Sequence, residues 1–137
     1  MRTTALTLAA ILAACSSGNA TSGSRGDFPA DALATATSAG GLHVEVRSSP
    51  QPPPRGTCTM QVTLSGASGP TDGVDIALVP WMDAMGHGTS IKPSVSAVGG
   101  GKYVVSNVSL FMPGTWSLRF AFSGAVNDEA TVPVDVP

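Results

Sequence analysis

Apolar and polar residues alternate along much of the chain after residue 41. In TCTMQVTL (57–64) and TWSLRFAF (115–122), every second position is apolar. The apolar positions are Cys58, Met60, Val62 and Leu64 in the first stretch and Trp116, Leu118, Phe120 and Phe122 in the second. A period of two is typical of a β-strand with one buried face. We therefore expect both stretches to be strands that turn these side chains into a core.

Seven segments share this alternation or are rich in β-branched residues. They are residues 42–46, 57–64, 74–79, 94–98, 102–110, 115–122 and 129–136. Turn signals such as Gly99–Gly101 separate them, and no segment keeps a helical period. Pro133 indicates that the last segment is an edge strand, because proline has no N–H to donate. The sequence predicts one all-β domain in residues 41–137, an immunoglobulin-like antiparallel β-sandwich of about seven strands.

The first forty residues follow a different pattern. Residues 1–14 have a positive charge at Arg2 and then an apolar run too short to span a bilayer, which is the layout of a secretory signal peptide. The motif LAAC, which ends at Cys15, resembles the lipobox of bacterial lipoproteins; an ordinary cleaved signal is the alternative. The resemblance implies lipidation of Cys15, an N-terminal membrane anchor and a periplasm-facing position in the bacterial cell envelope. The small and polar residues 15–40 then predict a lipidated flexible tether.

Residues near the anchor and in the strands allow further expectations. Ser16 and Ser17 are not the acidic residue that resembles an inner-membrane retention signal, which favours the outer membrane. If Cys15 carries lipid, Cys58 has no intramolecular disulfide partner, and its position predicts a buried, inert thiol. Met60 is expected in the core, and His43 is expected on a solvated face.

Charge and motif content restrict the classes of function. Charged residues make up 12% of the chain. Removing residues 1–14 deletes one of the seven basic residues and leaves nine acidic ones, a formal charge of −3. No basic patch is present, so nucleic-acid binding is not expected. The HExxH and GxSxG motifs are absent, and nothing near His87 and Ser90 offers an orienting acid, so we do not expect an enzyme.

One segment, VPWMDAMGHGTSIKP (residues 79–93), combines donors that suit a soft metal. Met82, Met85 and His87 lie within six residues, and Met112 precedes the Pro113–Gly114 turn. Thioethers select Cu(I), and imidazole is also acceptable to copper. Zinc prefers thiolates or several imidazoles, and calcium prefers clustered carboxylates. These four residues are therefore candidate Cu(I) ligands, provided that the loop around Met85 folds toward Met112.

Two other interpretations of the segment stay open. Methionine often packs against aromatic rings, and Trp81, Phe111 and Trp116 are near in sequence, so the cluster could be ordinary packing. Alternatively, WMDAMGHG could be an apolar loop that docks an envelope partner, since tryptophan and methionine are common at binding surfaces.

The order of motifs resembles the YtkA-like domain family, which is related to FixH-type periplasmic domains. The motifs are WMDAMGHG (81–88) and the spaced set Gly101, Tyr103, Met112, Pro113, Gly114 and Trp116, within a resemblance that covers residues 42–136. The resemblance implies an immunoglobulin-like sandwich near copper-handling or oxidase-assembly proteins. It also implies shared sulfur and polar positions at Met82, Met85, His87 and Met112, with Gly86, Gly114 and Trp116 serving turn and core. Family members more often have proline where this chain has Asp83.

Overall fold

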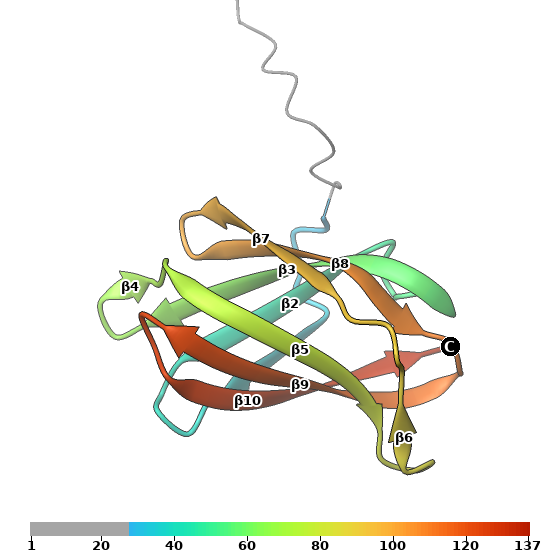
Figure 1. The fold of residues 1–137 in the computed structure, drawn as a ribbon. Coiled ribbons are helices and arrows are strands. Elements are labelled where there is room, and N and C mark those ends of the chain that lie inside the picture. The colour runs from blue at the N-terminus through green and yellow to red at the C-terminus, as the bar shows by residue number, and fades with distance from the viewer. Residues whose placement is uncertain (1–27) are drawn as a thin grey trace, which may run out of the picture.

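The described part of the chain forms two layers of antiparallel β-sheet (Figure 1). The structure is a computed structural model that describes residues 28–137. Its strands are β1 (Ala34–Thr37), β2 (His43–Ser49), β3 (Gly56–Gly66), β4 (Gly69–Pro70), β5 (Val74–Met82), β6 (His87–Gly88), β7 (Ser94–Gly99), β8 (Lys102–Leu110), β9 (Gly114–Gly124) and β10 (Asp128–Val136). The predicted signal peptide of residues 1–14, the predicted lipidation site Cys15 and the first part of the predicted tether lie outside the described residues.

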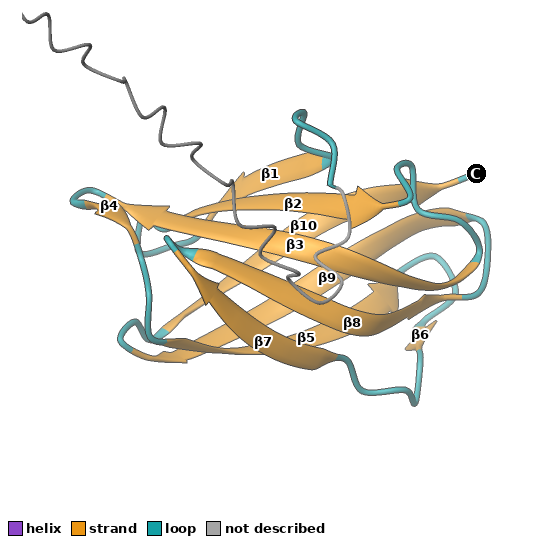
Figure 2. Ribbon diagram, turned by 90° about the horizontal axis from the view of Figure 1, so that it is seen from above, coloured by secondary structure: helices purple, strands orange, loops and turns teal. Residues whose placement is uncertain are grey.

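The strand order is that of an immunoglobulin-like sandwich. One sheet has the order β1-β2-β3-β8-β7 with β4 paired to β3, and the other has the order β10-β9-β5-β6. The four strands β2-β3-β8-β7 facing β10-β9-β5 reproduce a constant-type arrangement. Figure 2 shows strands and loops but no helix in the described residues. That part of the chain therefore contains no helix that could cross a bilayer. The predicted all-β fold is confirmed, and the seven long strands coincide with the seven predicted segments.

The alternation along the strands determines which side chains form the core. All apolar positions predicted to face inward are at most 5% exposed: Leu42, Val44, Val46, Cys58, Met60, Val62, Leu64, Trp116, Leu118, Phe120 and Phe122. Pro133 lies on β10, the edge strand of its sheet, as predicted. The side chain of His43 is 46% exposed, which agrees with a solvated face. Burial of these apolar side chains is the main favourable term for the fold.

A β-bulge in β8 interrupts the alternation. Cys58 pairs with Val108 and Met60 pairs with Val105, so one residue of β3 lies opposite two residues of β8. Asn107, within the bulge, has a φ of 59°. The extra residue shifts the parity of the strand, so that Val105 and Val108 both face the core although they are three positions apart.

The prediction of a flexible tether over residues 15–40 is wrong for the C-terminal end of that range. Residues 34–37 form β1, which pairs with β2 along the register Ala34↔Val46 to Thr37↔His43. Just beyond β1, the Ser38 hydroxyl and the Gly40 N–H donate to the carboxylate of Asp128 at the start of β10. Backbone pairing with an edge strand needs no large side chain, which is why these small residues are ordered.

Candidate functional site

A tight turn joins β5 to β6 at one end of the sandwich (Figure 1). Met82 and His87 are register partners across this short hairpin. The N–H groups of Met85 and Gly86 donate to the carbonyl of Met82, at 3.1 and 3.0 Å. Gly86 has a φ of 66°, a conformation that L side chains rarely adopt. The turn therefore returns His87 to the strand that carries Met82.

The β8–β9 turn lies beside this hairpin. A β-carbon on Gly114 would lie 2.9 Å from the terminal methyl carbon of Met82, so the absence of a side chain at Gly114 makes room for this methionine. Met82 is only 3% exposed and belongs to the hydrophobic core. Its thioether is therefore held inside the end of the sandwich, next to the turn that follows Met112.

An aromatic stack ties His87 to the same turn. The rings of His87 and Phe111 are stacked, with centroids 5.8 Å apart and an interplanar angle of 10°. Phe111 contacts Trp116 edge to face at 5.4 Å. The Nδ1 atom of His87 is 3.4 Å from the Gly88 carbonyl oxygen. A proton on Nδ1 would face this carbonyl and leave the lone pair of Nε2 for a metal.

The two remaining candidate ligands differ in exposure. Met112 is half-buried and packs against the core, while its carbonyl accepts a 2.9 Å hydrogen bond from the indole N–H of Trp116. Met85 is 54% exposed in the turn between β5 and β6. The structure thus brings Met82, His87 and Met112 to the same end of the sandwich and leaves Met85 on its surface.

Asp83 is directed toward β9. Its carboxylate accepts hydrogen bonds from the Ser117 hydroxyl and from the Arg119 guanidinium on β9, the latter at 2.8 Å. Arg119 also lies over the Trp81 ring, 4.9 Å from its centroid. The Ser117 hydrogen bond, followed by the hydrogen bond and charge of Arg119, lowers the pKa of Asp83 from its usual value. The carboxylate therefore fixes the turn to β9.

The donors at this end suit few metals. Among residues 28–137, no group of three or more His, Cys, Asp or Glu side chains could hold a metal ion. The other candidate donors beside His87 are the thioethers of Met82, Met85 and Met112, which would favour a soft ion. Cys58 is a buried free cysteine, and burial raises the pKa of its thiol to about 11, which suits the expected inert role.

The sequence interpretation did not identify two groups that hold this end together. Phe111 was treated only as a packing residue for methionines, although its ring lies against His87. The contact of Asp83 with Ser117 and Arg119 was also missed. The sequence held no signal for it, because the predicted segment 74–79 ends before Trp81, and the pairing of Trp81 with Ser117 is known only from the structure.

The fold and these turns define a class, an immunoglobulin-like β-sandwich with a methionine-containing turn at one end. A family model described as YtkA-like matches residues 37–121, more than half of the chain, and the chain belongs to this family. This confirms the main resemblance, although the match ends within β9 rather than extending to residue 136. The relation to FixH-type domains stays a prediction. No match was found among curated proteins or among solved structures.

Proposed function

We propose that the chain is a lipid-anchored protein of the bacterial cell envelope that binds Cu(I) through Met82, Met85, His87 and Met112. Its role is copper delivery or buffering without turnover. Lipidation at Cys15 attaches it to the membrane, where it faces the periplasm and supplies an envelope copper-handling or oxidase-assembly protein.

The observation that carries this proposal is the pairing of Met82 with His87 beside the turn that contains Met112. The register partnership, the stack of His87 on Phe111 and the space at Gly114 support one ligand group drawn from two turns. The orientation of Asp83 toward β9 supports a soft ion, because a hard cation would require that carboxylate.

The exposure of the donors suits a carrier. Met82 is held by the core, whereas Met85 is 54% exposed and is free to approach or leave a bound ion. An ion held by thioethers of unequal exposure can be passed to a partner by replacing the exposed ligand first. Thioethers are neutral and do not cancel the positive charge of the ion. An acceptor site with anionic ligands would therefore attract the ion.

A Cu(I) competition titration against a chromogenic chelator tests this proposal. The protein is a soluble form that begins at Ser16 and so keeps every described residue. We expect one ion per chain with a Kd below about 1 µM. Replacing all four candidates (Met82→Leu, Met85→Leu, His87→Gln and Met112→Leu) should weaken binding at least about 100-fold while the fold is kept.

Met60→Leu is the matched control, because it removes the same thioether from a core position at 0% exposure. Binding by the Met60 variant should equal that of the parent protein. Equal Cu(I) binding by the fourfold variant and the parent protein, or no binding by either, would contradict the proposal.

A second candidate function is docking of an envelope partner without metal. The exposure of Met85, at 54%, and of Phe111, at 45%, favours it, since both apolar side chains lie on the surface of this end. The same titration separates the two functions, because docking predicts no Cu(I) binding. Met85→Ser and Phe111→Ser would then weaken binding of a purified partner.

A further inference from the structure

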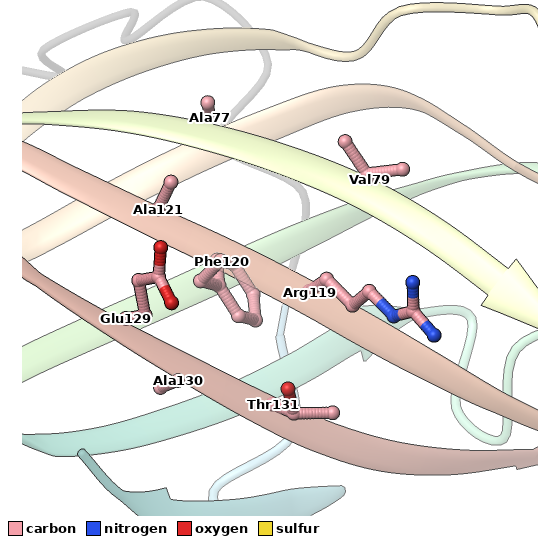
Figure 3. Close-up of a pocket in the computed structure, with 8 residues that line it drawn as sticks. All are labelled: Ala77, Val79, Arg119, Phe120, Ala121, Glu129, Ala130 and Thr131. Carbon is pink, nitrogen blue, oxygen red and sulfur yellow. The ribbon is translucent and has the colours of Figure 1, made fainter. Parts of the chain in front are cut away.

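A second surface lies apart from the methionine turn, on the outer face of β5, β9 and β10. A shallow hollow of about 360 Å³ crosses these three strands. Figure 3 shows the small side chains of Ala77 and Ala121 beside Glu129, and the side chains of Val79, Arg119 and Thr131 farther along the same strands. The hollow exists because the central positions of this face have almost no side chain.

The register of the strands explains how the hollow is built. Ala121 pairs with Ala77 on one side and with Glu129 on the other. In the next row, Arg119 pairs with Val79 and with Thr131. Val79 is 51% exposed and gives the hollow an apolar wall. The hollow can therefore receive one apolar side chain.

The charge of this face is one-sided. It carries four carboxylates, Asp75, Asp83, Glu129 and Asp135, and one guanidinium, Arg119, a formal charge of −3. Arg119 is already paired with Asp83. The other charged residues of the described chain are four basic and four acidic, so they balance one another. The whole excess negative charge of residues 28–137 thus lies on the face that contains the hollow.

We propose that the outer face of β5, β9 and β10 docks a basic polypeptide, which inserts one apolar side chain between Val79 and Glu129. Charge complementarity selects this occupant, because lysine or arginine beside the inserted side chain would meet Glu129 and Asp75. Trp81 and Arg119, which lie on this face, are residue types that dominate binding energy in interfaces. This surface is separate from the candidate copper ligands and does not depend on them.

The charge also argues against two other occupants. A second copy of the chain would bring a face of −3 against another of −3, and like charges across an interface oppose association. An anionic lipid surface would be repelled for the same reason.

Fluorescence anisotropy with a defined probe tests the proposal. The full-length chain, in a nonionic detergent, is titrated into the fluorescein-labelled peptide Lys-Val-Leu-Val-Lys. The comparison peptides are Glu-Val-Leu-Val-Glu, which reverses the charge, and Lys-Gly-Gly-Gly-Lys, which removes the apolar side chains. We expect the first peptide to bind at least about tenfold more tightly than either comparison peptide, and its affinity to fall as salt is added.

Three variants locate the binding. Glu129→Lys should weaken binding about fivefold or more, because it replaces an attraction by a repulsion. Ala121→Gln, which fills the hollow without changing charge, should weaken it about threefold. Asp31→Lys makes the same charge change away from this face. Asp31 follows Ala30, whose carbonyl accepts a hydrogen bond from Arg47 of the opposite sheet. This variant should leave the Kd within about twofold.

Other results would overturn the proposal. Equal binding of the three peptides, or equal effects of Glu129→Lys and Asp31→Lys, would show that no specific surface is involved. If a second copy of the chain occupies the hollow instead, sedimentation of the chain alone will show self-association that Ala121→Gln abolishes. If an anionic lipid surface occupies the hollow instead, a Cys15→Ser variant will float with phosphatidylglycerol vesicles, and adding Ala121→Gln will abolish this binding.

Discussion

Cys58 shows at the scale of one residue how burial controls chemistry. Burial raises its thiol pKa to about 11, so the thiolate is scarce at pH 8. We expect iodoacetamide to alkylate the folded protein at least about 100-fold more slowly than the protein in urea, followed by mass spectrometry. Because burial raises the pKa, ionisation of this thiol does not affect the free energy of unfolding below about pH 9, and it lowers that free energy as pH rises from about 9 toward 11. Rapid alkylation of protein that keeps its native circular dichroism would contradict the assignment.

The contribution of Asp83 to stability depends on pH in the opposite direction. Its pKa is lowered, chiefly by the Ser117 hydrogen bond, so its link to β9 is present above the usual carboxyl pKa and is lost as pH falls through the lowered one. We expect Ser117→Ala to raise the pKa of Asp83, measured by NMR titration of the carboxyl carbon. Asp128, which accepts from Ser38 instead, is the internal control and should not change. An unchanged Asp83 pKa in this variant would assign the lowering to Arg119 alone.

The β-bulge in β8 leads to a prediction about the backbone conformation of this strand. Asn107 has a φ of 59°, and a β-branched side chain in that conformation is strained. Asn107→Val should lower the free energy of unfolding by about 1–2 kcal/mol, whereas Asn107→Gly should change it little. Urea denaturation measures both. Ser106→Val places the same side chain at the adjacent position and should cost clearly less, so similar losses at the two positions would count against a conformational cause.

The strands differ in how far the sequence could predict them. The seven long strands were predictable because each buries one face, and burial enforces a period of two. β1, β4 and β6 have two to four residues and are held by backbone pairing, which leaves no hydrophobic pattern. The bulge was hidden for another reason, since the segment KYVVSNVSL is apolar on both sides of Asn107 and does not reveal where the parity changes.

The candidate site was predictable only as a set of residue types. The sequence supplied three thioethers and one imidazole, and it placed Met112 at the end of an apparent strand, just before the Pro113–Gly114 turn. The sequence could not show that Met82 would be buried and Met85 exposed, because both lie in or beside a turn of mixed composition. It also could not show the His87–Phe111 stack, which joins residues from two different turns.

At the scale of the whole molecule, the sandwich separates two surfaces with different chemistry. The end formed by the β5–β6 and β8–β9 turns carries the thioethers and His87, while the outer face of β5, β9 and β10 carries the excess negative charge. Asp83 and Arg119 lie where the two meet, because they join the methionine turn to β9.

Metal binding at that end has a consequence for the stability of the whole domain. A ligand that binds only the folded state at 100 times its Kd stabilises that state by about 2.7 kcal/mol. For a domain of this size, we expect Ag(I), a soft ion that needs no reductant, to raise Tm by about 10 °C, measured by circular dichroism. The protein should be the soluble form that begins at Ser16, which lacks Cys15, and should carry Cys58→Ala, since a thiol exposed on unfolding would bind silver and mask the effect. Zn(II) should give no comparable increase, because thioethers are poor zinc ligands. If Ag(I) raised the Tm of the Met82, Met85, His87 and Met112 fourfold variant equally, silver would be binding elsewhere, and the soft-metal site would have to be abandoned.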